Sequence, residues 1–92
     1  MKKRDYLLIC LMEECAEAQQ SCSKALRFGM GNRHPDCANT NRDDLQAEIA
    51  DLRAVIDILA AEGIICLSEE SRLSAMKKKM EKIESLIDEY VE

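Results

Sequence analysis

The shortage of turn-forming residues constrains the fold of this chain more than any other feature. It has three glycines and one proline in 92 residues, and a sandwich or barrel of many short strands needs more turns than these can supply. Aromatic residues contribute 3% of the sequence, so a core must consist mainly of Leu, Ile, Val, Ala, Met and Cys. The length suits one domain spanning residues 1–92. We therefore expect an all-α domain built from long helices.

The first helix is expected from about Asp5 to Phe28. Gly29 and Gly31 end it, and the segment 29–41 is rich in turn formers and predicts a loop. Within the helix, apolar and small side chains recur at spacings of three and four, which predicts one buried face. The members of this row are Leu8, Leu11, Cys15, Ala18, Cys22 and Ala25.

A second helix is expected to begin near Arg42 and to close at Gly63. At its start, Thr40 and Asp43 form a weaker version of the capping box, with Asp in place of Glu. Its apolar row is wide enough to predict contacts on more than one side of the helix. The row consists of Leu45, Ile49, Leu52, Val55, Ile56, Ile58 and Leu59.

A third helix is expected after Ser68, a favourable N-cap residue. Its apolar residues alternate spacings of three and four, like the a and d positions of a coiled coil: Leu73, Met76, Met80, Ile83, Ile87 and Tyr90. This row can pack on the first two helices, form a subunit interface, or do both. The expected fold is an antiparallel bundle of three long helices, and the apolar faces left over on a chain of this size would have to find another subunit.

Charge and cysteine content restrict the partners and the compartment. The net charge of −5 argues against binding to a nucleic-acid backbone, which requires a basic surface. The five cysteines are odd in number and include no Cys-x-x-Cys pair, so we expect reduced thiols and a cytoplasmic location. The basic start followed by the apolar run 6–12 imitates a signal peptide but stops at two glutamates without a cleavage site. Because no stretch approaches about 20 apolar residues, we expect no membrane span.

The most informative residues are two pairs of acidic side chains. Glu14 and Glu17 are three residues apart and share one helix face, and Glu48 and Asp51 repeat this spacing on the second helix. Each pair borders an apolar row, so antiparallel packing would bring the four carboxylates into one groove. Their mutual repulsion would be relieved by a cation, and ligation by oxygen alone favours Mg²⁺ or Mn²⁺ over zinc. The alternative is that both pairs are ordinary solvated helix surface.

Other chemistries fit the sequence less well. A di-iron carboxylate bundle needs Glu-x-x-His on two helices, whereas the only histidine, His34, lies in the expected loop. His34 and Cys37 have a metal-like spacing but lack two further ligands nearby. One histidine before a proline makes a nucleophilic triad implausible, and there is no glycine-rich phosphate loop.

The acidic motifs resemble the signature of MazG-like all-α nucleoside triphosphate pyrophosphohydrolases. The matching segments are Glu-Glu-Cys-Ala-Glu at 13–17 and Glu-Ile-Ala-Asp at 48–51. The stretch Ser-Lys-Ala-Leu-Arg-Phe-Gly at 23–29 is similar to one that follows the first motif in short, often phage-encoded members. Lys-Met-Glu-Lys-Ile at 79–83 is similar to the basic stretch on the family's last helix. The resemblance covers roughly residues 7–60.

The resemblance implies an enzyme that cleaves a (d)NTP to the (d)NMP and pyrophosphate, with Mg²⁺, or Mn²⁺ in its place. It implies a metal site of four carboxylates, Glu14, Glu17, Glu48 and Asp51, with Glu14 or Glu17 accepting the proton of the attacking water. Contacts to phosphate or ribose are expected from Lys24 and Arg27, with Lys79 and Lys82 as additional phosphate donors. The alternative for these basic residues is a solvated helix surface. The resemblance also implies that the bundle is assembled as a homodimer or homotetramer, and it leaves a short fourth helix open. The expected location is the cytoplasm, that of the host if the protein is phage-encoded. The alternative is a non-catalytic helical protein–protein interaction module with solvated acids and the third helix as docking surface.

Overall fold

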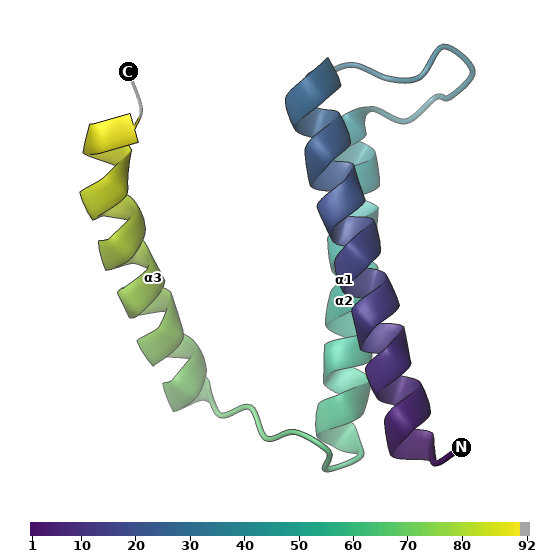
Figure 1. Ribbon diagram of the computed structural model, residues 1–92, viewed down its shortest axis with the longest axis vertical. Coiled ribbons are helices and arrows are strands. Elements are labelled where there is room, and N and C mark those ends of the chain that lie inside the picture. Colours follow the sequence, from purple (N-terminus) through teal and green to yellow (C-terminus); the bar gives the residue numbers. More distant parts are fainter. Residues whose placement is uncertain (91–92) are drawn as a thin grey trace.

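The computed structural model describes the backbone of residues 1–90 and the side chains of residues 1–87. Three helices follow one another along the chain (Figure 1): α1 (Lys3–Phe28), α2 (Asn41–Ala61) and α3 (Glu69–Tyr90). No strand occurs among the described residues. The predictions of an all-α fold class and of three long helices are therefore confirmed, and each helix begins close to the expected residue.

Local sequence signals set the helix ends. After α1, Gly29 adopts a φ of 93°, which glycine reaches without steric strain. The capping box of α2 is present, because Thr40 Oγ1 accepts from the Asp43 N–H at 3.1 Å and Asp43 Oδ2 accepts from the Thr40 N–H at 3.0 Å. The second of these bonds is the main cause that holds the pKa of Asp43 below its ordinary value of 3.8. At α3, Ser68 Oγ accepts from the Ser71 N–H at 3.0 Å, which confirms the predicted N-cap.

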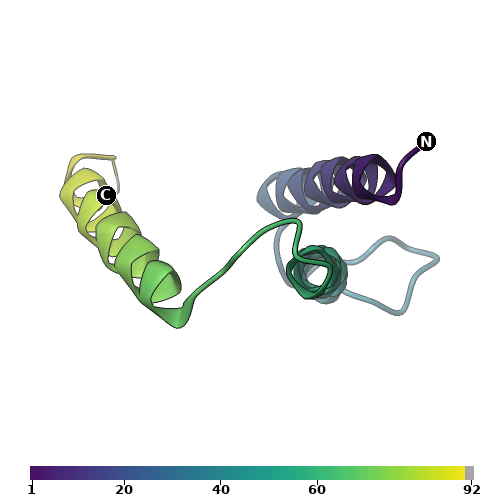
Figure 2. The same cartoon turned by 90° about the horizontal axis from the view of Figure 1, so that it is seen from below.

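α1 and α2 run antiparallel and pack side by side, with the loop between them projecting at one end (Figures 1 and 2). Three small residues of α1 are buried against α2 and allow the two helices to approach closely: Ala18, Ser21 and Ala25. From α2, Leu59 is 0% exposed and is the largest fully buried side chain. Where α2 ends, Glu62 Oε1 pairs with Lys3 Nζ at 2.7 Å and ties the start of α1 to it.

The buried strip is narrower than the apolar rows predicted. Leu8, Cys15 and Cys22 of α1 are exposed, as are Ile49 and Ile58 of α2, so the predicted burial is wrong at these positions. The expectation that the second helix would touch several neighbours is also not met, since α2 packs only against α1 among the described residues. A helix with one neighbour buries only the strip that faces it.

α3 makes no contact with α1 or α2 among the described residues, and both views show it standing apart from the pair (Figures 1 and 2). Its apolar row is 46–54% exposed: Leu73, Met76, Met80, Ile83 and Ile87. The side chain of Tyr90, the last predicted member, lies outside the described residues. Within one chain the bundle is thus a helix pair with a detached third helix. None of the described helices has an apolar stretch long enough to cross a lipid bilayer.

Candidate metal centre

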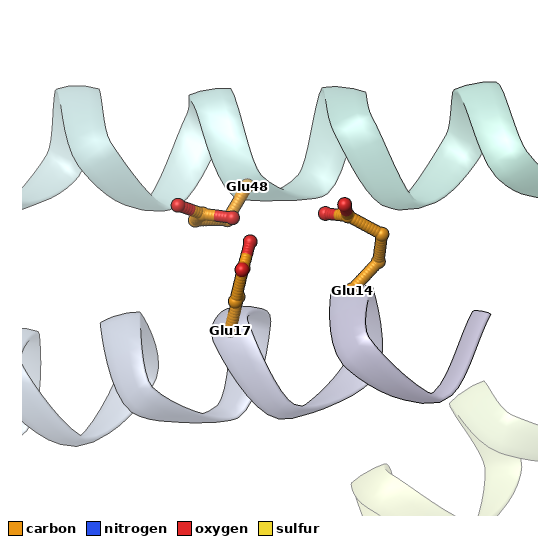
Figure 3. A group of neighbouring side chains, drawn as sticks. All are labelled: Glu14, Glu17 and Glu48. Carbon is orange, nitrogen blue, oxygen red and sulfur yellow. The ribbon is translucent and has the colours of Figure 1, made fainter. Parts of the chain in front are cut away.

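Three acidic side chains meet between α1 and α2. Glu14, Glu17 and Glu48 each present a carboxylate oxygen within 4.8 Å of the other two, and Figure 3 shows them pointing toward one another across the helix pair. We call this group the carboxylate trio. The spacing of three residues puts the two α1 members on one face, and the antiparallel packing brings the α2 member opposite them. In the part of the chain that the structure describes, no other group of three potential metal ligands lies this close together.

Two members of the trio each have a buried oxygen without a partner. Glu14 and Glu48 are half-buried, and the Oε2 atom of each is shielded from solvent and forms no hydrogen bond. Glu17 is exposed at the edge of the group. A buried acceptor that lacks a donor is costly, and most such groups in proteins are satisfied. A cation bound between the helices would satisfy both of these oxygens.

Two members of the trio, Glu14 and Glu48, have a pKa above the ordinary value of a glutamate. Burial is the main cause that raises the pKa of Glu14 above its ordinary value of 4.5, and the negative charges of Glu17, Asp51 and Glu13 add to the effect. Burial is also the main cause that raises the pKa of Glu48. A hydrogen bond with Glu17, which favours the protonated carboxyl, and the surrounding negative charges follow. A bound cation would reverse this balance, because it favours the ionised form.

The donor set fits a hard divalent cation. All three groups offer carboxylate oxygens, which suit Mg²⁺ and Mn²⁺, and no nitrogen or sulfur ligand is among them. In an octahedral Mg²⁺ site the ligand oxygens lie about 2.9 Å apart when adjacent and about 4.1 Å apart when opposite. The oxygens of the trio lie up to 4.8 Å apart, so they would have to draw closer around such an ion.

Asp51, the fourth predicted ligand, is not part of the trio. It is exposed, and it lies about one helical turn after Glu48 on α2. Its charge nevertheless raises the pKa of both Glu14 and Glu48, so it lies near enough to act on the site electrostatically. The structure thus brings together three of the four predicted carboxylates and leaves the fourth at the edge.

Two connected hollows open beside the trio. The inner hollow, of about 350 Å³, shares Glu17 and Glu48 with the trio and is further lined by Gln20, Ser21, Lys24, Asn41, Asp44 and Ala47. The outer hollow, of about 430 Å³, reaches the loop between α1 and α2 and is lined by Lys24, Phe28, Asn32, Arg33, His34, Pro35, Asn41 and Asp44. Lys24, Asn41 and Asp44 line both, so the hollows adjoin, and we call the two together the groove. The carboxylates lie at its inner part, and the rings of Phe28, His34 and Pro35 lie at its outer part.

The predicted basic residues are distributed unequally. Lys24 lines both hollows. Arg27 lines neither, and its guanidinium carbon lies 5.0 Å from the centre of the Phe28 ring, a cation–π arrangement. Lys79 and Lys82 are exposed on α3, and α3 does not contact the helix pair in the part of the chain that the structure describes. Of the four, only Lys24 lies beside the carboxylate trio within one chain.

Two groove residues were not predicted from the sequence. Asp44 is half-buried and lines both hollows, and its position four residues before Glu48, on the same helix face, is the signal that could have identified it. Asn41 also lines both hollows, and its Nδ2 donates to the carbonyl of Gly29 at 2.8 Å. This bond holds the start of α2 against the end of α1. Helical spacing does not predict it, because the two residues lie on opposite sides of the loop.

Comparison of the chain with family models, curated proteins and solved structures finds no match. Its function must therefore be inferred from the residues of the groove and their geometry.

Proposed function

We propose that the protein is a Mg²⁺-dependent nucleoside triphosphate pyrophosphohydrolase of the MazG-like all-α type. It would cleave a (d)NTP with water to give the (d)NMP and pyrophosphate. The observation that carries this proposal is the carboxylate trio, in which Glu14 and Glu48 each keep a buried oxygen without a hydrogen-bond partner. Mn²⁺ has the same preference for oxygen ligands and is proposed as a substitute.

Glu14, Glu17 and Glu48 would hold the ion, and Asp51 would add negative charge at the rim. When bound, the ion would supply neutralisation of the triphosphate charge and activation of the water that cleaves the bond between the α and β phosphates. Glu17 is the exposed member of the trio and is the one best placed to accept a proton from that water. Glu14 is the second candidate for this role.

The groove beside the trio supports a nucleotide as substrate. Lys24 lines both hollows, and its ammonium group is suited to a phosphate oxygen next to the carboxylates. The combined groove lies within the usual size range of small-molecule sites. Its outer part offers the rings of Phe28, His34 and Pro35 to a nucleoside. An acidic chain needs the cation to accept a polyanionic substrate, so the metal and the substrate are proposed to bind together.

The proposal includes a homodimer or homotetramer, in which the three-helix bundle is completed between chains, and a cytoplasmic setting, that of the host if the protein is phage-encoded. The detached α3 with its exposed row supports an assembly, because a row of this kind is seldom left in water.

The same α3 row favours a second candidate function, a non-catalytic helical interaction module. In that case the acids would be solvated surface and α3 would dock on another protein. The two candidates differ in their dependence on Glu48, which only the hydrolase requires.

Pyrophosphate release from a panel of (d)NTPs tests the proposal, with Mg²⁺ in one series and EDTA in the other. Glu48→Gln keeps the shape of the side chain and removes its charge, so it should lower turnover at least about tenfold. This is the smaller of the losses in activity typically seen when a residue that supports a metal site is replaced. Glu81→Gln makes the same change at an exposed position of α3 and should leave turnover unchanged. Wild-type turnover in a folded Glu48→Gln variant would refute the metal site.

A further inference from the structure

Asp44 is a carboxylate of the groove that the proposed metal site does not use. It is half-buried and lines both hollows, but it is not a member of the carboxylate trio. Lys24 also lines both hollows, yet the ion pairs among the described residues include none between these two opposite charges. The groove therefore offers its occupant an acceptor and a donor that do not neutralise each other.

The first turn of α2 holds the backbone of Asp44 in place. The capping box of Thr40 and Asp43 starts the helix, and the Asp44 N–H donates to the carbonyl of Thr40 at 3.1 Å. In the same turn, Asn41 Nδ2 donates to the carbonyl of Gly29 at 2.8 Å, which ties the turn to the end of α1. Asp43 already forms the cap, so the cap does not require a second acid at position 44.

The order of residues along the groove matches the order of groups in a nucleotide. Asp44 precedes Glu48 by four residues, so its backbone lies about 6 Å from that of Glu48 along the α2 axis, toward the loop. Phe28, His34 and Pro35 line only the outer hollow, whereas Asp44 lines both. The trio, Asp44 and the rings thus follow one another as the phosphates, the sugar and the base do in a nucleoside triphosphate.

A carboxylate at this position suits the hydroxyl groups of a sugar. An ionised carboxylate accepts hydrogen bonds and donates none, and its two oxygens match the two adjacent hydroxyls of ribose, at the 2′ and 3′ positions. Hydrogen bonds from a hydroxyl to a carboxylate are among the stronger ones in proteins, and an acidic side chain binds the ribose 2′-hydroxyl in dinucleotide-binding folds. The negative charge of Asp44 also opposes the placement of a phosphate here.

We propose that Asp44 accepts hydrogen bonds from the 2′ and 3′ hydroxyls of ribose and so makes ribonucleoside triphosphates the preferred substrates. This inference rests on the proposed function, because it places the sugar of that substrate in the same groove. A deoxyribonucleotide lacks the 2′ hydroxyl and leaves one oxygen of a half-buried carboxylate without its donor. A site that binds a hydroxyl by hydrogen bonds discriminates against the analogue that lacks it.

Hydrolysis of matched nucleotide pairs tests the assignment. ATP, GTP, CTP and UTP are each compared with the 2′-deoxy counterpart in Mg²⁺, and we expect kcat/KM to be at least about tenfold higher for the ribonucleotide of a hydrolysed pair. Asp44→Ala removes both acceptor oxygens and should bring this ratio close to one. Asp57→Ala makes the same change at an exposed position of α2 that lines neither hollow, and it should leave the ratio unchanged.

Binding of nucleoside monophosphates measures sugar recognition without turnover. Each NMP and its dNMP are titrated into the wild type and into Asp44→Ala by calorimetry in Mg²⁺. These ligands carry the sugar but no bond between two phosphates. We expect the NMP to bind at least about tenfold more tightly than the dNMP to the wild type, and we expect this difference to disappear in Asp44→Ala.

The outcomes separate a failure of this assignment from a failure of the proposed function. Hydrolysis that is equal for both sugars, or faster with the dNTP, overturns the assignment and leaves the hydrolase intact. Ribose preference in monophosphate binding that depends on Asp44, without any turnover, supports the assignment and overturns the hydrolase.

The variant provides two further ways to overturn the assignment. If Asp44→Ala lowers kcat/KM equally for both sugars, Asp44 acts on the fold or on the metal rather than on the sugar. If the preference for ribose persists in Asp44→Ala, another residue reads the sugar. The absence of both turnover and monophosphate binding at millimolar concentration overturns the assignment and the hydrolase together.

Discussion

Mg²⁺ should raise the thermal midpoint of the protein without any nucleotide present. Three carboxylates lie within 4.8 Å of one another, two of them with buried oxygens that lack partners, and unfolding separates these charges. A cation that binds only the folded arrangement stabilises it by about 2.7 kcal/mol at a hundredfold excess over its dissociation constant. For a domain of this size each kcal/mol moves the midpoint by roughly 4–8 °C. The expected rise is therefore about 10–20 °C at that excess.

Variants of the acidic residues distinguish the effect of charge repulsion among the carboxylates from the effect of losing a metal ligand. Glu48→Gln removes one charge from the trio and keeps its shape, so it should raise the metal-free midpoint and flatten the response to Mg²⁺. Asp51→Asn should act in the same direction but less strongly, because Asp51 is exposed and lies outside the trio. Glu81→Gln on α3 should change neither quantity.

The assay is a circular dichroism melt at constant ionic strength, with chelator, Mg²⁺ or Mn²⁺. Constant ionic strength matters because salt alone screens exposed acidic groups. Identical midpoints with and without several millimolar of either ion would refute a preformed site. An equal response in wild type and Glu48→Gln would refute the assignment of the trio as its ligands.

Three further predictions concern pH, substrate binding and packing. The folded-state pKa of Glu14 lies above its ordinary value of 4.5, so the folded state disfavours the ionised carboxylate. Without metal, the free energy of unfolding should therefore be highest with respect to Glu14 below pH 4.5 and should fall as pH rises through the raised pKa. Glu14→Gln should therefore gain stability relative to wild type as pH rises from 4.5 in chelator melts, and a difference independent of pH would contradict this. Lys24→Ala should raise KM about tenfold through loss of one charged hydrogen bond, while Lys79→Ala leaves steady-state kinetics unchanged, and equal effects would oppose the placement of substrate in the groove. Leu59→Ala should cost about 2–5 kcal/mol in denaturant unfolding, because Leu59 is 0% exposed, whereas Ile58→Ala at 46% exposure should cost less than about 1 kcal/mol; equal costs would contradict the packing of α2 on α1.

The helices could be predicted from the sequence because their signals are local. The capping box of Thr40 and Asp43 and the positive φ of Gly29 involve residues within a few positions of each other, and such signals act in the same way in most folds. Glu14, Glu17 and Glu48 could be predicted to lie near one another because helical spacing puts Glu14 and Glu17 on one face, and both this pair and Glu48 border an apolar row that packs.

The features that escaped prediction depend on neighbours distant in the sequence. An apolar row that faces the chain's own core and one that faces another subunit have the same period, so the exposure of Leu8, Cys15 and Cys22 could not be distinguished from burial. For the same reason, the apolar row of α3 did not reveal that this helix makes no contact with α1 or α2 among the described residues. Asp51 was placed with Glu48 by spacing alone, but spacing does not determine burial, and Asp51 is exposed and lies outside the trio.

Identification of the reaction products tests the central claim most directly. Purified protein is incubated with each (d)NTP in Mg²⁺ or in EDTA, and the nucleotide and phosphate products are separated by anion exchange. We predict equal amounts of (d)NMP and pyrophosphate from at least one nucleotide with Mg²⁺, and no turnover in EDTA. Release of (d)NDP and orthophosphate, or the absence of turnover with both Mg²⁺ and Mn²⁺, would contradict the proposed function.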